Sequence, residues 1–369
     1  MDKKRFVVLF PNCPNIGLLK DVGQIPYILG KYHENMRTEL VSRAIDTDGP
    51  NLDKVLGLDI IKIPYLFKND MIAGVYYLLR HSKKINWLNL YHCGRKTYYW
   101  AKLYKFLNPG GKVYLKLDLD FVSCDLYDKN LKARRFFKKA TQIMDLVSVE
   151  SMAIFDRIQR YTDQKIQVIG NGYVNLDEEI DLSAPRDNIF ITVGRLGTRQ
   201  KATDVLLEAF ADTVDKHDWK LKLIGTIEPE FEPIIKEIFK KHPKLRGRVI
   251  FTGHIEDRRL LYSEYAKAKV FVLTSRWESF GIVCAEALAC GCRMILSEGV
   301  APMKEITNNR KYGDIVPVND INALSIALLN ASVYQYSSKE VDEIANYAKD
   351  RFSWIKICER LNGFLMNMD

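Results

Sequence analysis

Short apolar runs alternate with longer amphipathic segments along most of the chain. The apolar runs are bounded by turn residues and are typical of buried strands, whereas the segments between them carry apolar residues at helical spacing. In the first half we predict strands at 5–10, 39–44, 58–63, 86–91, 112–118, 146–149 and 166–169. Helices are predicted at 17–29, 70–84, 96–107, 131–144 and 151–161. This alternation indicates a parallel sheet covered by helices.

A polar stretch at residues 171–187, with five acidic residues and Pro185, interrupts this alternation. Strands are then predicted at 188–193, 220–224, 249–252, 270–273, 294–296 and 315–316. Helices are predicted at 204–213, 229–241, 257–268, 320–330, from Ser337 onward and at 354–366, and a further segment at 302–307 is left without an assigned type. A chain of 369 residues exceeds the usual size of one domain. We therefore predict two doubly wound α/β domains, with a ligand in the cleft where the carboxyl ends of both sheets face each other.

Composition places the chain among ordinary globular proteins. Apolar residues make up 47% of it, and no apolar run is long enough to span a bilayer. The run at 6–10 is too short for a signal peptide, so we expect a cytoplasmic protein with a first strand near its N-terminus. The seven cysteines are scattered, which fits reduced thiols better than disulfides. Cys290 and Cys292, the close pair, lack a second pair or a nearby histidine, so we predict packing and no zinc site.

The net charge of +9 is concentrated in the first half of the chain. Residues 71–117 contain nine Lys or Arg and ten aromatic residues but no acidic residue. Such a block favours an anionic surface or an anionic substrate, and a solvated face is the alternative. Its densest cluster consists of Lys96, Lys102 and Lys105 with Tyr98, Tyr99, Trp100 and Tyr104.

The stretch from Ser275 to Gly291, S-R-W-E-S-F-G-I-V-C-A-E-A-L-A-C-G, follows a predicted strand and organises the second half. Gly281 opens a helical pattern, and a helix N-terminus at a strand end is suited to an anion. Glu278 precedes this helix, and Glu286 lies within it among apolar neighbours. A buried carboxylate needs a partner, which could be a ligand's diol or a cation such as Arg293 or Lys304.

A second motif follows the strand that opens the second half. Val193-Gly-Arg-Leu-Gly-Thr-Arg-Gln-Lys201 places Gly194 and Gly197 among three cations. A flexible turn with arginines and a lysine at a strand end is suited to a diphosphate. The spacing matches neither G-x-x-x-x-G-K-[ST] nor G-x-G-x-x-G. A basic surface loop is the alternative interpretation.

The order of these motifs resembles glycosyltransferase family 4, retaining nucleotide-sugar transferases of the GT-B fold. The resemblance rests on the 193–201 loop with the following L-L-E-A-F helix, on L-x-L-I-G at 221–225, and on the Glu, seven residues, Glu signature at 278–286. It implies two Rossmann-like domains facing across a cleft: 1–180 for the acceptor and 181–350 for the nucleotide sugar, with a C-terminal helix at 351–369 that packs back on the first. Two positions depart from the family: Ala202 stands where many members have Gly, and Arg293 stands where Pro is usual.

The resemblance also implies roles for single residues. Arg195 and Lys201 would hold the diphosphate and stabilise the leaving charge, Glu278 would bind sugar hydroxyls, and Glu286 would bind the ribose. The other donor-binding positions would be Gly194, Gly225, His254, Phe280, Gly281, Ile282 and Val283. In the first domain, Gly17 would approach the transferred sugar and His92 would contact it. The segment Ser148–Ser151 would face the cleft.

The implied function is transfer of a hexose or N-acetylhexosamine, with uridine diphosphate as the default carrier, to a glycan or a lipid-phosphate-linked acceptor. No cofactor and no metal are expected, although Asp118-Leu-Asp120 resembles the metal motif of GT-A transferases. The block at 71–117 could rest on an anionic bilayer, which would place the protein at the inner face of the membrane; no nucleic acid is expected. The alternatives are a sugar-nucleotide epimerase or hydrolase, and a non-catalytic partner subunit.

Overall fold

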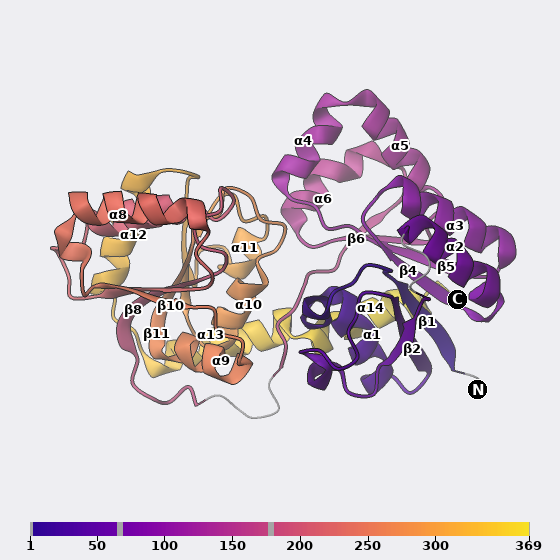
Figure 1. Ribbon diagram of the computed structural model, residues 1–369, viewed down its shortest axis with the longest axis horizontal. Helices are drawn as coiled ribbons and strands as arrows, with labels where there is room; N and C mark the ends of the chain where they lie inside the picture. The colour runs from indigo at the N-terminus through magenta and orange to yellow at the C-terminus, as the bar shows by residue number, and fades with distance from the viewer. Residues whose placement is uncertain (1–2, 65–68, 176–180, 369) are drawn as a thin grey trace. The chain divides into compact units, whose positions relative to one another are not determined.

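The computed structural model describes residues 3–64, 69–175 and 181–368. The chain divides into two compact units (Figure 1). The first comprises Met1–Val174 with Ser353–Asp369, and the second comprises Asn175–Phe352. The predicted domain boundary at residue 180 lies outside the described residues. Each unit is described by itself below.

The first unit is built on a parallel sheet. Its strands are β1 Lys4–Leu9, β2 Met36–Ser42, β3 Asp59–Lys62, β4 Trp87–Tyr91, β5 Lys112–Lys116, β6 Leu146–Val149 and β7 Ile166–Val168. The seven strands lie in the order β3-β2-β1-β4-β5-β6-β7, so the strand order reverses between β1 and β4. Loops at the carboxyl ends of these two strands therefore flank the position where such sheets usually bind ligands.

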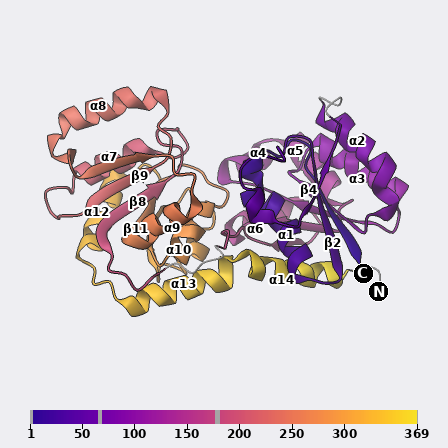
Figure 2. The same ribbon diagram turned by 60° about the horizontal axis from the view of Figure 1, so that its bottom comes forward.

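Helices cover this sheet on both faces. The α-helices are α1 Asp21–Tyr32, α2 Asp70–His81, α3 Arg95–Leu107, α4 Phe121–Lys129, α5 Leu131–Thr141, α6 Met152–Ile158 and α14 Trp354–Met366, and the 3-10 helices are η1 Asn15–Leu19, η2 Leu52–Val55, η3 Ser82–Lys84 and η4 Gln159–Tyr161. The last helix, α14, lies beside α1 in both views (Figures 1 and 2). Its apolar residues, among them Trp354 and Leu361, join the core of the first sheet.

The second unit repeats the plan. Its strands are β8 Asp187–Val193, β9 Lys220–Ile224, β10 Val249–Gly253, β11 Ala268–Leu273, β12 Arg293–Ser297 and β13 Gly313–Val316. Its helices are α7 Thr203–Ala211, η5 Pro229–Phe231, α8 Glu232–Lys241, η6 Pro243–Leu245, α9 Arg258–Lys267, α10 Ile282–Ala289, α11 Met303–Ile306, α12 Ile321–Val333 and α13 Ser338–Phe352. The parallel strand order is β10-β9-β8-β11-β12-β13, with the reversal between β8 and β11.

Most predicted elements are confirmed, with several helices divided into an α-helix and a 3-10 turn. Two of the differences have identifiable reasons. The helix predicted at 17–29 is divided: a 3-10 turn ends at Leu19, Lys20 is extended, and α1 begins at Asp21. Helix α4 was not predicted because its apolar residues follow no clear helical period. Its start is defined by Asp120, whose carboxylate accepts a hydrogen bond from the Ser123 N–H at 2.7 Å.

Candidate functional site

Two loops meet at the carboxyl edge of the second sheet. The glycine loop 194–201 leaves β8, and the loop 274–281 leaves β11, which is the neighbour of β8 at the strand-order reversal. The Arg276 N–H donates to the Gln200 carbonyl at 2.7 Å, so the two loops are joined directly. The two sequence motifs thus form one site, at the position where doubly wound sheets bind ligands.

Lys201 and Glu278 form the centre of this site. The Lys201 Nζ lies 2.5 Å from the Glu278 Oε2, with side-chain exposures of 17% and 14%. Backbone hydrogen bonds hold Glu278 in place, since its N–H donates to Gly299 and its carbonyl accepts from Ala301. The site therefore presents a cation suited to phosphate and an acceptor suited to hydroxyls at a single point.

Arg276 holds the glycine loop in place, a role that its sequence context did not predict. Its guanidinium donates to the Arg199 carbonyl at 2.8 Å, the Asp204 carboxylate at 3.1 Å and the Asn319 side chain at 2.6 Å. The only sequence signal was its position inside the 275–291 stretch. Because these partners lie on three separate segments, Arg276 fixes the loop that carries Lys201.

Ala202 is the N-cap residue directly before helix α7 and has the left-handed conformation, with φ of 50°. Such a conformation costs an L-residue about 1–2 kcal/mol, and glycine avoids this cost. The Thr274 hydroxyl donates to the Lys201 and Ala202 carbonyls at 3.0 and 3.1 Å and so supports the turn. The departure from glycine noted in the sequence therefore leaves the shape of the loop intact.

The N-terminus of α10 forms another side of the site. Gly281 has φ of 75°, and no side chain caps this helix. A Cβ atom at Gly281 would lie 3.3 Å from the Cys284 sulfur and 3.4 Å from the Glu278 Cγ, so the turn has little room for a side chain. Ile282 and Val283 are partly exposed, whereas the Phe280 side chain is buried against Phe352. Phe280 can therefore serve a ligand only through its backbone.

Glu286 is buried and already has two partners. Its side chain is 4% exposed and forms an ion pair with Arg258. Its second oxygen accepts a hydrogen bond from the Tyr265 hydroxyl at 3.2 Å. The cation that pairs with Glu286 is thus Arg258 and neither of the two suggested by the sequence, Arg293 and Lys304. Arg293 pairs with Glu340. Nothing near Arg258 in the sequence pointed to it, since it lies 28 positions before Glu286.

A cavity of about 290 Å³ opens beside these groups. Predicted site residues contribute to its lining, namely Gly194, Arg195, Gly225, His254 and Val283. Arg258 lines it as well, whereas Lys201 lines a small neighbouring hollow of about 10 Å³ with Gly194 and Arg195. Gly225 is required here, since a Cβ atom would lie 1.8 Å from the Gly194 carbonyl oxygen. One edge of the sheet therefore combines cations, glycines and a cavity.

Gly17 and His92, both in the first unit, flank the strand-order reversal of their own sheet. Gly17 lies in η1 after β1 and is buried against the Cys13 sulfur, which an added Cβ would approach to 2.5 Å. His92 follows β4, is exposed, and has φ of 60°, an uncommon value for a residue other than glycine. Backbone strain of this kind often marks functional positions, and the roles predicted for both residues stay predictions.

The Ser148–Ser151 segment is buried, not exposed at an edge. The Lys116 Nζ donates to the Glu150 Oε1 at 3.0 Å and to the Ile169 carbonyl at 3.0 Å, and both charged side chains have no solvent exposure. Burial works to lower the pKa of Lys116, but Glu150 together with Tyr114 and Asp21 outweighs burial and raises this pKa above its ordinary value. The pair anchors the ends of β5 and β6.

Asp118 and Asp120 do not form a visible ligand cluster. Asp120 caps α4. Among residues 3–64, 69–175 and 181–368, no group of three or more His, Cys, Asp or Glu side chains is placed to hold a metal ion. The expectation that the reaction needs no metal stays a prediction.

The structure shows which aromatic and basic residues of the block at 71–117 are buried, paired or exposed. Tyr98, Trp100 and Tyr104 are buried, so three aromatic members of that cluster belong to the core. Lys96 pairs with Asp70, and Lys105 pairs with Asp145. The exposed apolar residues of the block are Ile72 and Leu79 on α2 and Tyr99 and Phe106 on α3. In the described part of the chain, no helix is long and apolar enough to cross a bilayer.

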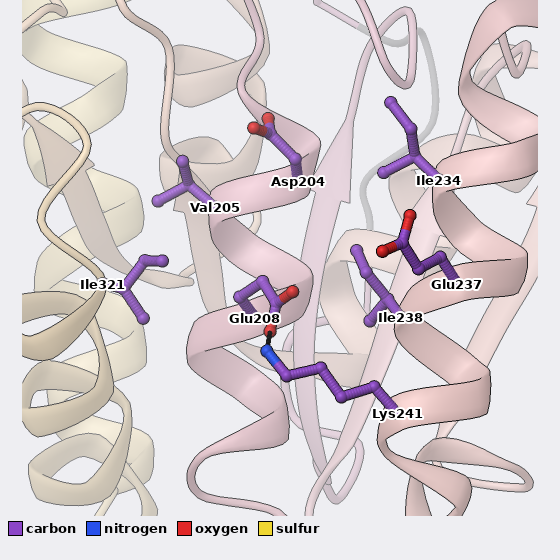
Figure 3. A pocket seen from close by; sticks show the side chains of 8 residues that line it. All are labelled: Asp204, Val205, Glu208, Ile234, Glu237, Ile238, Lys241 and Ile321. Carbon is purple, nitrogen blue, oxygen red and sulfur yellow. Dashed lines mark hydrogen bonds and ion pairs between the residues drawn. The ribbon is translucent and has the colours of Figure 1, made fainter.

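A further hollow of about 300 Å³ lies between α7, α8 and α12 (Figure 3). Its apolar wall includes Val205, Ile238 and Ile321, and Asp204, Glu208 and Glu237 line its rim. Lys241 reaches across to Glu208 at 3.5 Å. None of the predicted site residues lines this hollow.

Comparison with known proteins finds a family match in the second unit. Residues 175–351 match the family model of glycosyl transferases group 1. An uncharacterized glycosyltransferase of Methanocaldococcus jannaschii is 27% identical over 229 residues, which are 62% of this chain and 61% of the relative. The N-acetylgalactosamine-N,N'-diacetylbacillosaminyl-diphospho-undecaprenol 4-alpha-N-acetylgalactosaminyltransferase of Campylobacter jejuni is 28% identical over 143 residues, 38% of this chain and 36% of the relative. The match thus spans about three fifths of the archaeal relative and about a third of the bacterial one.

A solved structure shows the same fold over nearly the whole chain. HepE of Anabaena in complex with UDP has a TM-score of 0.71 at 16% identity, and the match covers 99% of this chain and 100% of that one. The fold is GT-B, with two Rossmann-like doubly wound domains, as predicted. The match to the group 1 model supports the prediction of a transferase enzyme.

Proposed function

We propose that this protein is a retaining glycosyltransferase that moves a hexose or N-acetylhexosamine from a UDP-linked sugar to a glycan or a lipid-linked acceptor. The pathway would be synthesis of a cell-surface polysaccharide or glycoconjugate. The observation that carries the proposal is the Lys201–Glu278 pair at the strand-order reversal, beside the cavity of about 290 Å³. A nucleotide sugar combines a diphosphate with two sets of hydroxyls, and this edge offers cations and carboxylates for both.

Each group at the edge has a chemical role in the proposal. Lys201 and Arg195 compensate the charge that grows on the departing diphosphate, together with the N-terminus of α10. Glu278 accepts hydrogen bonds from the transferred sugar, and Glu286 serves the ribose. Because cations and a helix N-terminus supply this compensation, the reaction proceeds without a metal.

Two similarities support the choice of carrier and acceptor. The HepE structure contains UDP, which favours uridine as the base. The Campylobacter relative is named for a diphospho-undecaprenol acceptor, which favours a lipid-linked one. A lipid-linked acceptor fits a protein that works on the cytoplasmic face of a membrane.

The outer face of α2 and α3 is our candidate for membrane contact. Ile72 and Leu79 are 51% and 62% exposed and lie one heptad apart on α2, and Tyr99 and Phe106 are 54% and 81% exposed with the same spacing on α3. The two helices pack side by side through Gly74 and Trp100. With the nearby cations Arg80, Lys83, Lys84 and Lys102, this face suits an anionic bilayer.

Product analysis tests the proposed reaction. The protein is incubated with UDP-glucose, UDP-galactose or their N-acetyl forms, with and without a panel of polyprenyl-diphosphate-linked glycans. We expect release of UDP that depends on acceptor and a glycosylated product with retained anomeric configuration. Acceptor-independent formation of an epimer or free sugar would identify an epimerase or a hydrolase. Nucleotide-sugar binding without turnover on any acceptor would favour a non-catalytic partner subunit.

A further inference from the structure

Arg258 is a charged residue of the cavity that the predicted site does not include. It is the first residue of α9, and its side chain is 15% exposed. The guanidinium pairs with Glu286 and lies 5.2 Å from the centre of the Tyr262 ring. Its Nε is buried and has no hydrogen-bond partner in the described part of the chain. An arginine offers five N–H donors, so this one has donors left for a ligand.

Arg258 is the cationic partner that holds the buried Glu286 in place. A buried carboxylate is costly unless it is paired, and the ion pair with Arg258 and the hydrogen bond from Tyr265 provide that pairing. Burial works to lower the pKa of Arg258, but Glu286 together with Tyr262 and Tyr265 outweighs burial and raises this pKa. Arg258 therefore stays charged beside Glu286.

The position of Arg258 in the cavity wall, with Glu286 directly behind it, indicates which part of a nucleotide the pair meets. Arg195 and Val283, at the glycine loop and the α10 N-terminus, line the end suited to phosphate. His254 and Ile255, after β10, line another part. Arg258 lines the same cavity, whereas Glu286 lies one helical turn beyond Val283 and does not appear in its wall. A ligand in the cavity thus meets Arg258 before it meets Glu286.

We propose that Arg258 is a ribose-binding residue, which acts with Glu286 as a pair on the vicinal diol of the nucleotide. A hydroxyl both donates and accepts, so Arg258 donates to the ribose oxygens while the free lone pairs of Glu286 accept from their protons. This inference rests on the proposed function, because it assumes that the cavity holds a nucleoside diphosphate. It adds a second ribose contact to the one expected of Glu286.

Calorimetric titration with UDP and 2′-deoxy-UDP tests the pair. The wild-type protein should bind UDP at least about ten-fold more tightly, because the deoxy ligand leaves buried polar groups unpaired. Arg258→Ala should bring the ratio of the two dissociation constants close to one. Arg259→Ala is the matched control, since it removes an exposed arginine next along the same helix and should keep the wild-type ratio.

The outcomes separate this inference from the proposed function. If the wild-type protein binds neither UDP nor GDP nor ADP, the proposed function fails. If Arg258→Ala binds UDP and keeps the wild-type ratio, or weakens both ligands equally, the ribose assignment of Arg258 is overturned while the proposed function stands. Should the alanine variant fail to fold, Arg258→Lys takes its place. A single ammonium cannot bind both Glu286 and the diol as the guanidinium does, so the ratio of the two dissociation constants should fall in this variant too. An unchanged ratio would refute the assignment.

Discussion

The Lys201 ammonium and the Glu278 carboxylate, which lie 77 positions apart in the chain, are 2.5 Å apart in the structure. Each comes from a loop that follows one of the two strands at the reversal of the second sheet. The pair is largely shielded from solvent, so both charges are strongly felt by a ligand placed between them. A nucleotide-sugar donor would bring its phosphate to Lys201 and its sugar hydroxyls to Glu278. Two contacts with the donor would then replace the ion pair between these residues.

Replacing Lys201 should remove activity without unfolding the protein. In Lys201→Ala we expect turnover to fall by about 10²–10³, because one cation that stabilises the leaving diphosphate is lost. The free energy of unfolding should fall by about 1–3 kcal/mol, since the partly buried Glu278 carboxylate loses its hydrogen-bonded cation. UDP release under saturating donor and acceptor measures the first quantity, and urea unfolding measures the second.

Lys201→Arg is the matched control because it keeps the charge. It should recover part of the turnover while changing stability little. Full activity in Lys201→Ala would show that Lys201 does not belong to the site. An equal loss of turnover in both variants, with normal stability, would mean that the exact position of the cation matters more than its charge.

Arg276→Ala should loosen the glycine loop. The three contacts of Arg276 with Arg199, Asp204 and Asn319 would be lost, at a cost of about 1–3 kcal/mol in stability. We expect the KM for the donor to rise about ten-fold, because the loop that carries Lys201 must be ordered by the ligand itself. Steady-state kinetics checks this. An unchanged KM would show that the loop holds its shape without Arg276.

Most of the fold was predictable because each element follows its own local pattern. The strand at Leu146–Val149 and the helix at Trp354–Met366 have the predicted bounds. Helix α4 was missed since its start depends on a capping carboxylate and not on apolar spacing. The break at Lys20 was missed because a 3-10 turn and an α-helix share similar apolar spacing.

The proximity of Lys201 and Glu278 was predictable because each lies in a motif that directly follows a strand end. Arg276 and Arg258 could not be identified in the same way. Their roles come from partners distant in the sequence, Asp204 and Asn319 for one and Glu286 for the other. The sequence could not show which aromatic residues of the cluster at 98–104 are buried, because they lie on several sides of one helix.

The buried pair in the first unit should be costly to break. Lys116→Met leaves Glu150 without its cation, and we expect a loss of about 3–5 kcal/mol in the free energy of unfolding. The double variant Lys116→Met/Glu150→Met should lose clearly less, because no charge is left unpaired between these positions. Urea unfolding of the two single variants and the double variant gives the coupling energy. Additive losses would contradict a direct interaction.

Alkaline pH should destabilise the protein through its buried thiols. Burial raises the pKa of Cys13 and Cys124 to about 12, and that of Cys292 to about 11. Their unfolded forms ionise near pH 9, so the stability they contribute is complete below pH 9 and declines as pH rises toward 11–12. Between pH 9 and its pKa in the folded protein, each thiol should lower the free energy of unfolding by up to about 1.4 kcal/mol per pH unit.

Urea unfolding at pH 8, 9 and 10 measures this decline. Replacing Cys124 with alanine should make the slope between pH 9 and 10 shallower, and the native thiols should react slowly with a thiol reagent at pH 8. Stability that stays constant up to pH 10 would show that these thiols ionise as readily in the folded protein as in the unfolded one.

The central claim is that the carboxyl edge of the second sheet binds a nucleoside diphosphate sugar through Lys201 and Glu278. Thermal unfolding of the wild-type protein and of Lys201→Ala, each with UDP, GDP, ADP and their sugars, tests it most directly. We predict that one nucleotide and its sugar raise the wild-type melting temperature, UDP first among them, and that the shift is largely lost in Lys201→Ala. No shift with any nucleotide at millimolar concentration, or an equal shift in the variant, would contradict the account.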